Sequence, residues 1–265
     1  MKTRTLLPGL ALALALLTAT AAQAGQNCNT APAEPWRTTL ALTMADQLNT
    51  TLNSRSAQIA VISRVGSDVS KYGLRYTHAA LVYRTAPGAP WTVLHKLNTC
   101  GTDQGKLYRQ GLGNFFLDTP HEYRAMVVWL KKDVEQKVLA AVTSESRIRA
   151  IDQPRYSLLA YPYGTSTQNS NGWLIEFLAS ATAPQPIYSR GEAQRRMRNT
   201  HFDPDVIHIG TSERLGASVA RANVSFLDHP LRHRLAGDYE TVTVESLVRW
   251  LDRQGWIAAQ TEISN

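Results

Sequence analysis

Two histidines, His78 and His95, lie on either side of a predicted turn in the first half of the chain. The runs 76–83 and 91–97 are typical of β-strands, and a Pro-Gly pair between them marks the turn of a hairpin. The midpoint between the two histidines falls inside this turn, so a nearly symmetric hairpin places them directly opposite each other on one face. One imidazole could then act as a base and the other could orient it, although a register shift of one residue would separate them. Surface or core roles are also compatible with this pattern.

Ser170 is the third residue whose type and position could do chemistry. It follows a turn-rich segment that begins at Tyr161, and it precedes an apolar stretch, 173–179, that predicts a buried helix with Trp173 and Phe177 in the core. A hydroxyl at a helix start lies at the positive end of the helix dipole, near backbone N–H groups that can stabilise an oxyanion. The alternative is that Asn169 or Ser170 is an ordinary helix cap, because both residue types are favoured there.

Other polar clusters have structural interpretations beside the chemical ones. The run 201–208 holds ligand-type side chains, but it includes an Asp-Pro turn signal and matches no recognised metal-ligand motif. The segment 228–230, Asp-His-Pro, fits either a supporting pair for a site or a turn. Asp68 and Ser70 could line a cleft or form the loop ahead of the hairpin. The sequence therefore indicates no cofactor and no metal site.

The rest of the chain predicts the elements that would position these residues. Apolar residues at helical spacing predict helices over 36–52, 134–149 and 244–251, with a more polar helix over 191–199 and a further one over 213–222. Beside the hairpin, strands are predicted over 58–63, 123–130 and 239–243, with a short apolar run at 206–209 and a strand or turn at 156–160. The glycine-bearing segment 98–118 has no periodicity and predicts a long loop. We therefore expect one α+β domain over residues 25–265, with helices packed against an antiparallel sheet.

Residues 1–24 have the pattern of a secretory signal peptide. Lys2 and Arg4 precede an apolar run, and Ala22-Gln23-Ala24 provides a small-x-small cleavage site. That run is too short to span a bilayer, and no later segment reaches about 20 apolar residues. We therefore expect cleavage after Ala24 and a periplasmic or secreted protein that does not span the membrane.

The formal net charge is +7, and Lys2 and Arg4 account for two of these units. The basic residues are densest at 195–198 and 232–234, with no nucleic-acid-binding motif beside them. An exported protein is also in the wrong compartment for nucleic acid, so we expect none as a partner. Anionic polymers of the envelope are compatible with the charge.

Both cysteines, Cys28 and Cys100, lie beyond the predicted signal peptide. In an oxidising compartment a single pair predicts a disulfide, which would tie the new N-terminus to the middle of the chain. The rival interpretation makes Cys100 a reactive thiol with His95 nearby, and it requires Cys100 to be free.

Three segments in order carry a resemblance to known families: 77–83 (THAALVY), 93–95 (VLH) and 168–176 (QNSNGWLIE). They resemble circularly permuted papain-like proteins, including permuted NlpC-type cell-wall hydrolases and the lecithin–retinol acyltransferase-like group. Nearly the whole mature chain is similar to an uncharacterised Gram-negative exported family, domain of unknown function 2145. The segments 76–84, 94–101, 168–178 and 228–230 carry that second likeness.

The resemblance implies a papain-like fold in which Ser170 occupies the position of the nucleophilic cysteine. It implies that His78 is the catalytic histidine and that His95 is the third polar residue of the site. A hydroxyl needs its proton removed during attack, whereas a thiol ionises more readily, so this exchange bears on activity. The resemblance therefore implies a hydrolase or acyltransferase acting on envelope peptides or lipid esters. The alternative is a catalytically inactive module that binds an envelope peptide, glycan or partner protein in the same cleft.

Overall fold

The computed structural model describes residues 34–220 and 222–265. Its centre is a six-stranded sheet with the order β4-β3-β2-β1-β5-β8, in which every neighbouring pair is antiparallel. The strands are β1 (Ile59–Val65), β2 (His78–Tyr83), β3 (Thr92–Asn98), β4 (Gly105–Gln110), β5 (Glu122–Leu130) and β8 (Ile257–Ser264). The predicted α+β class with an antiparallel sheet and packed helices is confirmed.

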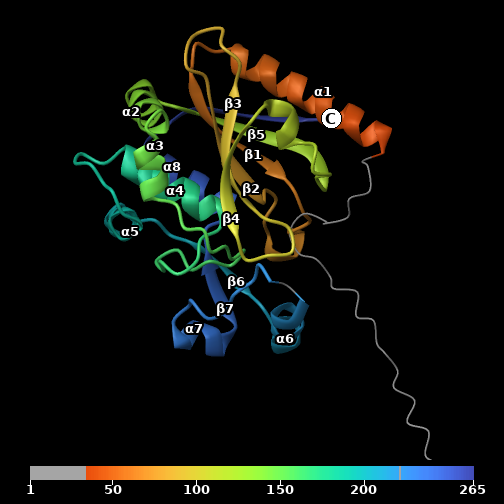
Figure 1. The fold of residues 1–265 in the computed structure, drawn as a ribbon, viewed down its shortest axis with the longest axis vertical. Helices are drawn as coiled ribbons and strands as arrows, with labels where there is room; N and C mark the ends of the chain where they lie inside the picture. Colours follow the sequence, from red (N-terminus) through yellow and green to blue (C-terminus); the bar gives the residue numbers. More distant parts are fainter. Residues whose placement is uncertain (1–33, 221) are drawn as a thin grey trace, which may run out of the picture.

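Helices cover both faces of this sheet (Figure 1). On one face lies α1 (Pro35–Asn53), whose buried residues Ala41, Met44, Leu48 and Leu52 recur at helical spacing and pack on the sheet. The other face carries α2 (Lys132–Val142), α3 (Glu145–Ala150), α4 (Ser170–Ala181) and α8 (Val244–Arg253). Because successive side chains of a strand point to opposite faces, alternate residues of β1 and β2 fill the two cores.

Every residue of α4 is buried, which makes this helix the centre of the larger core. Trp173 and Phe177, one turn apart, are 0% and 1% exposed, and their rings stack with centroids 5.5 Å apart. Their predicted core position is confirmed. The next helix, α5 (Arg190–Asn199), packs beside α4 and carries most of its polar residues outward.

A smaller lobe lies at the opposite end of the molecule from α1 (Figure 1). It contains a two-stranded antiparallel sheet, β6 (Asp205–His208) with β7 (Asp238–Thr241), and two helices, α6 (Thr211–Ala220) and α7 (Leu231–Ala236). Ile207, Ile209 and Tyr239 form its small apolar core. Across the described residues, no helix is both long enough and apolar enough to cross a bilayer.

The sequence prediction differs from the structure at four elements, one of which is the short helix α7, which was not predicted. The segment 98–118 is not a structureless loop, because it forms β4 and the short 3-10 helix η2 (Leu112–Phe115). The predicted helix 134–149 is broken into α2 and α3 at Thr143 and Ser144. The C-terminal strand β8 was not predicted, because as an edge strand it buries little and half of its residues are polar.

Two predictions fall outside the described residues. The signal peptide, 1–24, is one of them, and Cys28 is the other. The disulfide between Cys28 and Cys100 therefore stays a prediction.

Candidate functional site

His78 and His95 are brought together by the hairpin, with His78 Nε2 2.9 Å from His95 Nδ1. They are not directly opposite. Leu81 pairs with Leu94, and the same register continued toward the start of β2 would place His95 opposite Ala80, two residues from His78. The predicted direct opposition is therefore wrong, but an offset of two residues keeps both imidazoles on one face, within reach of a diagonal contact.

A hydrogen-bonded chain fixes the proton positions of this pair. Gln110 Oε1, at the end of β4, lies 3.0 Å from His95 Nε2. An amide oxygen can only accept, so His95 donates from Nε2, and in its neutral form its Nδ1 is an acceptor. His78 then donates from Nε2 to His95, which leaves the lone pair of His78 on Nδ1. The chain Gln110–His95–His78 thus presents one oriented basic nitrogen.

Phe115 and Arg64 enclose the pair. The Phe115 ring lies 5.8 Å from the His78 ring and 6.0 Å from the His95 ring, measured between centroids. Arg64 is paired with His78 across β1 and β2, and its guanidinium lies over Phe115 and forms an ion pair with Asp118. The histidines therefore lie in a buried environment with a fixed positive charge beside them.

Both imidazoles are uncharged at neutral pH. Burial lowers the pKa of His95 to about 4, with a smaller lowering by the charge of Arg64, while the hydrogen bond to Gln110 opposes the change. Burial also lowers the pKa of His78 well below its ordinary value, and the charges of Arg64 and His95 act in the same direction. Neutral imidazoles are proton acceptors, which is the form that a general base requires.

The buried pair predicts a loss of stability on acidification. Between pH 6.5 and about 4, His95 is protonated in the unfolded chain but stays neutral in the folded chain. The free energy of unfolding therefore falls as pH falls through this window. For His95 alone we expect a loss of about 3 kcal/mol by pH 4. Urea unfolding at several pH values measures it. His95→Gln should flatten the dependence and the exposed-site control His121→Gln should not; an unchanged slope in His95→Gln would contradict the prediction.

Ser170 is the first residue of α4, as the sequence predicts, and Asn169 is the helix cap. The Gly172 N–H donates to Asn169 Oδ1 over 2.6 Å, and Asn169 in turn donates to Leu158 O and Thr241 Oγ1. A Cβ at position 172 would lie 2.9 Å from Asn169 Oδ1, so only glycine permits this close cap. The cap interpretation is thus confirmed for Asn169, and Ser170 keeps its hydroxyl for other contacts.

Asn171 joins the first turn of α4 to the backbone on both sides of His78. Its Oδ1 accepts from the Ala79 N–H at 3.0 Å, and its Nδ2 donates to Thr77 O at 3.3 Å. The His78 ring nevertheless lies on the α1 face with Phe115, whereas α4 packs on the other face. Within residues 34–220 and 222–265, no hydrogen bond joins Ser170 to either histidine.

Tyr156 lies near Ser170, and both residues are buried. Burial raises the pKa of the Tyr156 phenol, and hydrogen bonds from the hydroxyl and N–H of Ser170 oppose that rise. Gly105 makes room for it, since a Cβ there would lie 2.9 Å from the Tyr156 ring. Tyr156 also lines a pocket of about 290 Å³ together with Thr167, Val224 and Phe226. This pocket borders Tyr156, and Ser170 is not among the residues that line it.

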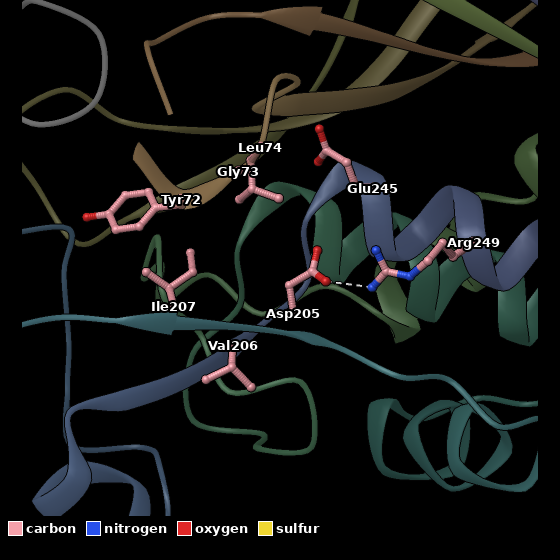
Figure 2. A pocket seen from close by; sticks show the side chains of 8 residues that line it. All are labelled: Tyr72, Gly73, Leu74, Asp205, Val206, Ile207, Glu245 and Arg249. Atoms are coloured by element: carbon pink, nitrogen blue, oxygen red, sulfur yellow. Dashed lines mark hydrogen bonds and ion pairs between the residues drawn. The ribbon is translucent and has the colours of Figure 1, made fainter. Parts of the chain in front are cut away.

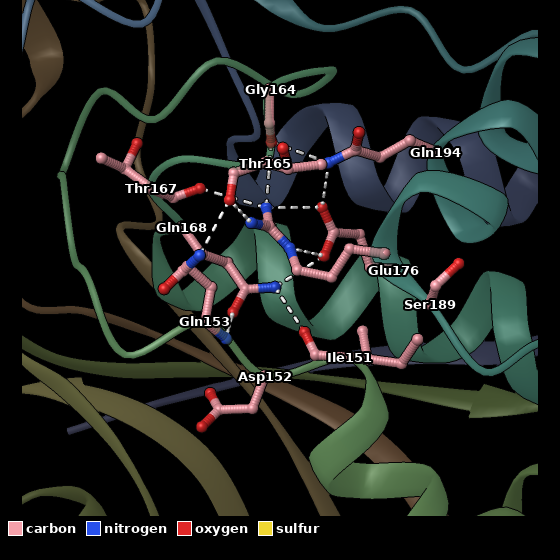
Figure 3. A network of polar contacts seen from close by, with 12 residues as sticks. Ile151, Asp152, Gln153, Gly164, Thr165, Thr167, Gln168, Glu176, Ser189 and Gln194 are labelled. Atoms are coloured by element: carbon pink, nitrogen blue, oxygen red, sulfur yellow. Dashed lines mark hydrogen bonds and ion pairs between the residues drawn. The ribbon is translucent and has the colours of Figure 1, made fainter.

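A buried ion pair holds the segment that leads to Ser170 (Figure 3). Glu176 of α4 accepts from Arg190 at 2.8 and 2.9 Å and from the amides of Gln168 and Gln194 at 2.6 and 2.8 Å. Arg190 also donates to the carbonyl groups of Gly164, Thr165 and Thr167. The segment 161–169 that leads to α4 is therefore held by side-chain hydrogen bonds, because it forms no helix or strand.

Asp228 supports the same approach segment from the smaller lobe. Its Oδ2 accepts from the Tyr161 N–H at 3.0 Å and from Thr167 Oγ1 at 2.6 Å, and its Oδ1 lies 2.9 Å from His229 Nδ1. His229 is buried and its Nε2 lies 2.7 Å from Glu240 O. Asp228 and His229 thus connect the segment before α4 to Glu240 of β7. Neither the interpretation as a supporting pair nor the interpretation as a turn describes this role fully.

The remaining candidates are placed elsewhere. Asp68 accepts from the N–H and hydroxyl of Ser70, which is the loop interpretation. His208 is exposed, and its Nδ1 contacts Asp238 Oδ1. Among the side chains that the structure describes, no three His, Cys, Asp or Glu residues are grouped as metal ligands. A second pocket, of about 230 Å³, lies between β6 and α8 and includes the ion pair of Asp205 and Arg249 (Figure 2).

Four residues of the site were missed by sequence reasoning: Arg64, Gln110, Phe115 and Tyr156. Gln110 and Phe115 lie in the segment predicted to be a loop, so no face could be assigned to them. Arg64 has a readable signal, because the predicted strand 58–63 extends to it and the hairpin then pairs it with His78. Tyr156 forms only an isolated bridge with Gln168, which no periodicity predicts.

The comparisons with known proteins identify a family and no function. No curated protein matched the chain, and no solved structure matched it. Residues 51–251 match a family described as an uncharacterized protein conserved in bacteria, domain of unknown function 2145. This match covers most of the chain, including both histidines and the whole of α4. The chain therefore belongs to the DUF2145 family.

Proposed function

We propose that this chain is an exported hydrolase or acyltransferase of papain-like, circularly permuted NlpC type, acting on amide or ester bonds. The observation that carries the proposal is the chain Gln110–His95–His78, which leaves one uncharged and oriented imidazole nitrogen. The resemblance of the segments around His78, His95 and Ser170 to such enzymes supports the same conclusion.

In the proposed reaction the Ser170 hydroxyl attacks the carbonyl carbon while His78 Nδ1 accepts the hydroxyl proton. The imidazolium then returns this proton to the leaving amine or alcohol, and water or an acceptor alcohol releases the acyl group from Ser170. His95 holds His78 in orientation by accepting its Nε2–H. The positive end of the α4 dipole favours the oxyanion that forms beside Ser170.

This reaction requires more than a rotation of the Ser170 side chain, because the His78 ring lies on the α1 face of the sheet and α4 packs on the other face. Asn171 joins the two segments at the backbone, so the required motion is a rearrangement of the start of β2 that turns the His78 ring toward the α4 face. Hydrogen bonds of catalytic groups often form only in the complex with substrate, so their absence in the free protein is compatible with the proposal. Predicted export makes peptidoglycan stem peptides or lipid acyl esters the expected substrates.

The contact of Ser170 with Tyr156 favours a second candidate function. A hydroxyl engaged by a buried phenol is poorly placed for attack, and a site built for a thiolate generally loses activity with serine. In this alternative the chain is an envelope module that binds a peptide, glycan or partner protein in the pocket beside Tyr156 without turnover.

A serine-directed fluorophosphonate probe distinguishes the two. If the chain is a hydrolase, the probe is expected to label Ser170, identified by peptide mass spectrometry, and Ser170→Ala should abolish the label. Ser56 is exposed in the loop after α1, so Ser56→Ala is the matched control that keeps it. Absence of label in the wild type would contradict the proposal. Hydrolysis of a p-nitrophenyl ester gained only by Ser170→Cys would then support the binding module, as a lapsed enzyme.

A further inference from the structure

The smaller lobe exposes a group of leucines. Leu215, Leu227, Leu231 and Leu235 are 67%, 73%, 62% and 74% exposed. Single exposed apolar residues are ordinary, but several in one small lobe indicate an interaction surface. The two helices that carry three of them are joined, because Arg214 of α6 donates to the carbonyl of Arg234 in α7 at 2.6 Å.

The geometry of α7 separates an inner from an outer side. His233 faces inward, with its Nδ1 3.6 Å from a Glu240 carboxylate oxygen and its side chain 13% exposed. Leu231 and Leu235 are one turn apart and therefore share a side of the helix, roughly opposite His233. Arg232 and Arg234 flank this side in the helical projection. The outer side of α7 is thus an apolar strip between two basic residues.

Positive charge extends from α7 toward α5. Burial raises the pKa of Tyr161, the charge of Glu240 adds to the rise, and the charges of Arg198 in α5 and Arg232 in α7 oppose it, so one carboxylate and two cations lie near this ring. The nearby acidic groups are engaged: Glu240 faces His233, and Asp238 accepts from His208 at 2.8 Å. The leucine strip is therefore flanked by two arginines, while the nearby carboxylates of Glu240 and Asp238 contact histidines.

We propose that the outer side of α7 docks this chain onto an anionic lipid bilayer. Leu227, Leu231 and Leu235 would enter the interface, and Arg232 and Arg234 would meet the headgroup phosphates. Protruding leucines between basic residues suit such an interface, where apolar burial and charge attraction act together. A second copy of the same face would oppose like charges, and a folded partner would need a matching groove. This inference goes beyond the proposed function and does not depend on it.

Co-sedimentation with vesicles tests the docking, using the chain as purified after natural processing. Binding is expected to vesicles of phosphatidylethanolamine with phosphatidylglycerol and to be much weaker with phosphatidylcholine alone. Leu231→Ser with Leu235→Ser should lower the partition coefficient about tenfold or more. Arg232→Gln should lower it about fivefold, and less at high salt. Leu42→Ser on α1, at a side chain 53% exposed, is the matched control expected to have no effect.

Several outcomes would overturn the docking. Equal binding to both kinds of vesicle would remove the anionic surface as the partner. Undiminished binding by the double leucine variant would place the lipid contact elsewhere, and circular dichroism of that variant checks that it is folded. Failure to bind vesicles, together with self-association that the double variant abolishes in analytical ultracentrifugation, would assign the surface to a second copy instead.

Discussion

Replacing Arg190 with methionine is expected to lower the free energy of unfolding by about 3–5 kcal/mol, because it leaves the carboxylate of Glu176 buried without its cation. The Glu176 side chain is 2% exposed, and Arg190 supplies two of the four hydrogen bonds that it accepts. The same change removes the Arg190 hydrogen bonds to three carbonyl groups of the approach segment, of which Gly164 O and Thr165 O keep a donor from another side chain. Urea unfolding at pH 7 measures the loss.

Two variants give this prediction its controls. Arg195→Met, on the same helix but with a side chain 66% exposed, should cost well under 1 kcal/mol. Burial already raises the pKa of Glu176, so in Arg190→Met the carboxyl is expected to take up a proton more easily and the deficit to shrink as pH falls. A deficit below 1 kcal/mol at pH 7 would show that the ion pair does not hold the approach segment.

His78→Ala is expected to lower the rate of Ser170 labelling by about 10²–10⁴-fold, because it removes the only base of the proposed reaction. The rate constant for reaction with the fluorophosphonate, measured over a series of probe concentrations, provides the number. His78→Ala should also lower the free energy of unfolding at neutral pH, but by no more than the truncation of any other buried side chain of that size. An equal labelling rate in His78→Ala would remove His78 from the mechanism.

His95 allows a sharper version of the same experiment. His95→Ala removes the acceptor for the His78 Nε2–H, and a loss of about 10-fold to 100-fold is expected. His95→Asn keeps an acceptor oxygen, so its labelling rate should lie above that of His95→Ala. If His95 had a purely structural role, the two variants would have equal labelling rates. His121→Ala, at an exposed histidine, is the control that leaves the rate unchanged.

The part of the fold that the sequence predicts is the part with strong periodicity. The bounds of four elements were predicted within two residues of those observed: α1, the hairpin strands β2 and β3, and α8. The shared face of His78 and His95 was predicted from a nearly symmetric hairpin, and the observed offset of two residues preserves it. Their register was not, because it is set by how the turn packs, and an offset of two residues preserves the alternation.

The remaining features depend on tertiary contacts that leave no local pattern. Gln110 ends a strand that begins at Gly105 and is followed by Gly111, and the packing of Tyr156 requires the glycine at 105. β8 is a strand because β5 offers it a partner, and its polar sequence alone would not select an extended conformation. The nearness of α4 to both sides of His78 arises from one side chain, Asn171, in a position that reads as an ordinary first turn.

The end of the histidine chain determines how the pair responds to its surroundings. Gln110 is an amide and has no proton to gain or lose, so its bond to His95 is the same in acid and in base until His95 itself is protonated. A carboxylate at that position would attract a proton onto the imidazoles and would titrate in its own right. The histidine pair is therefore held by a hydrogen bond to an uncharged group, which keeps the orientation of both rings constant over a wide pH range. The protonation of His78 then sets the reactivity of the pair.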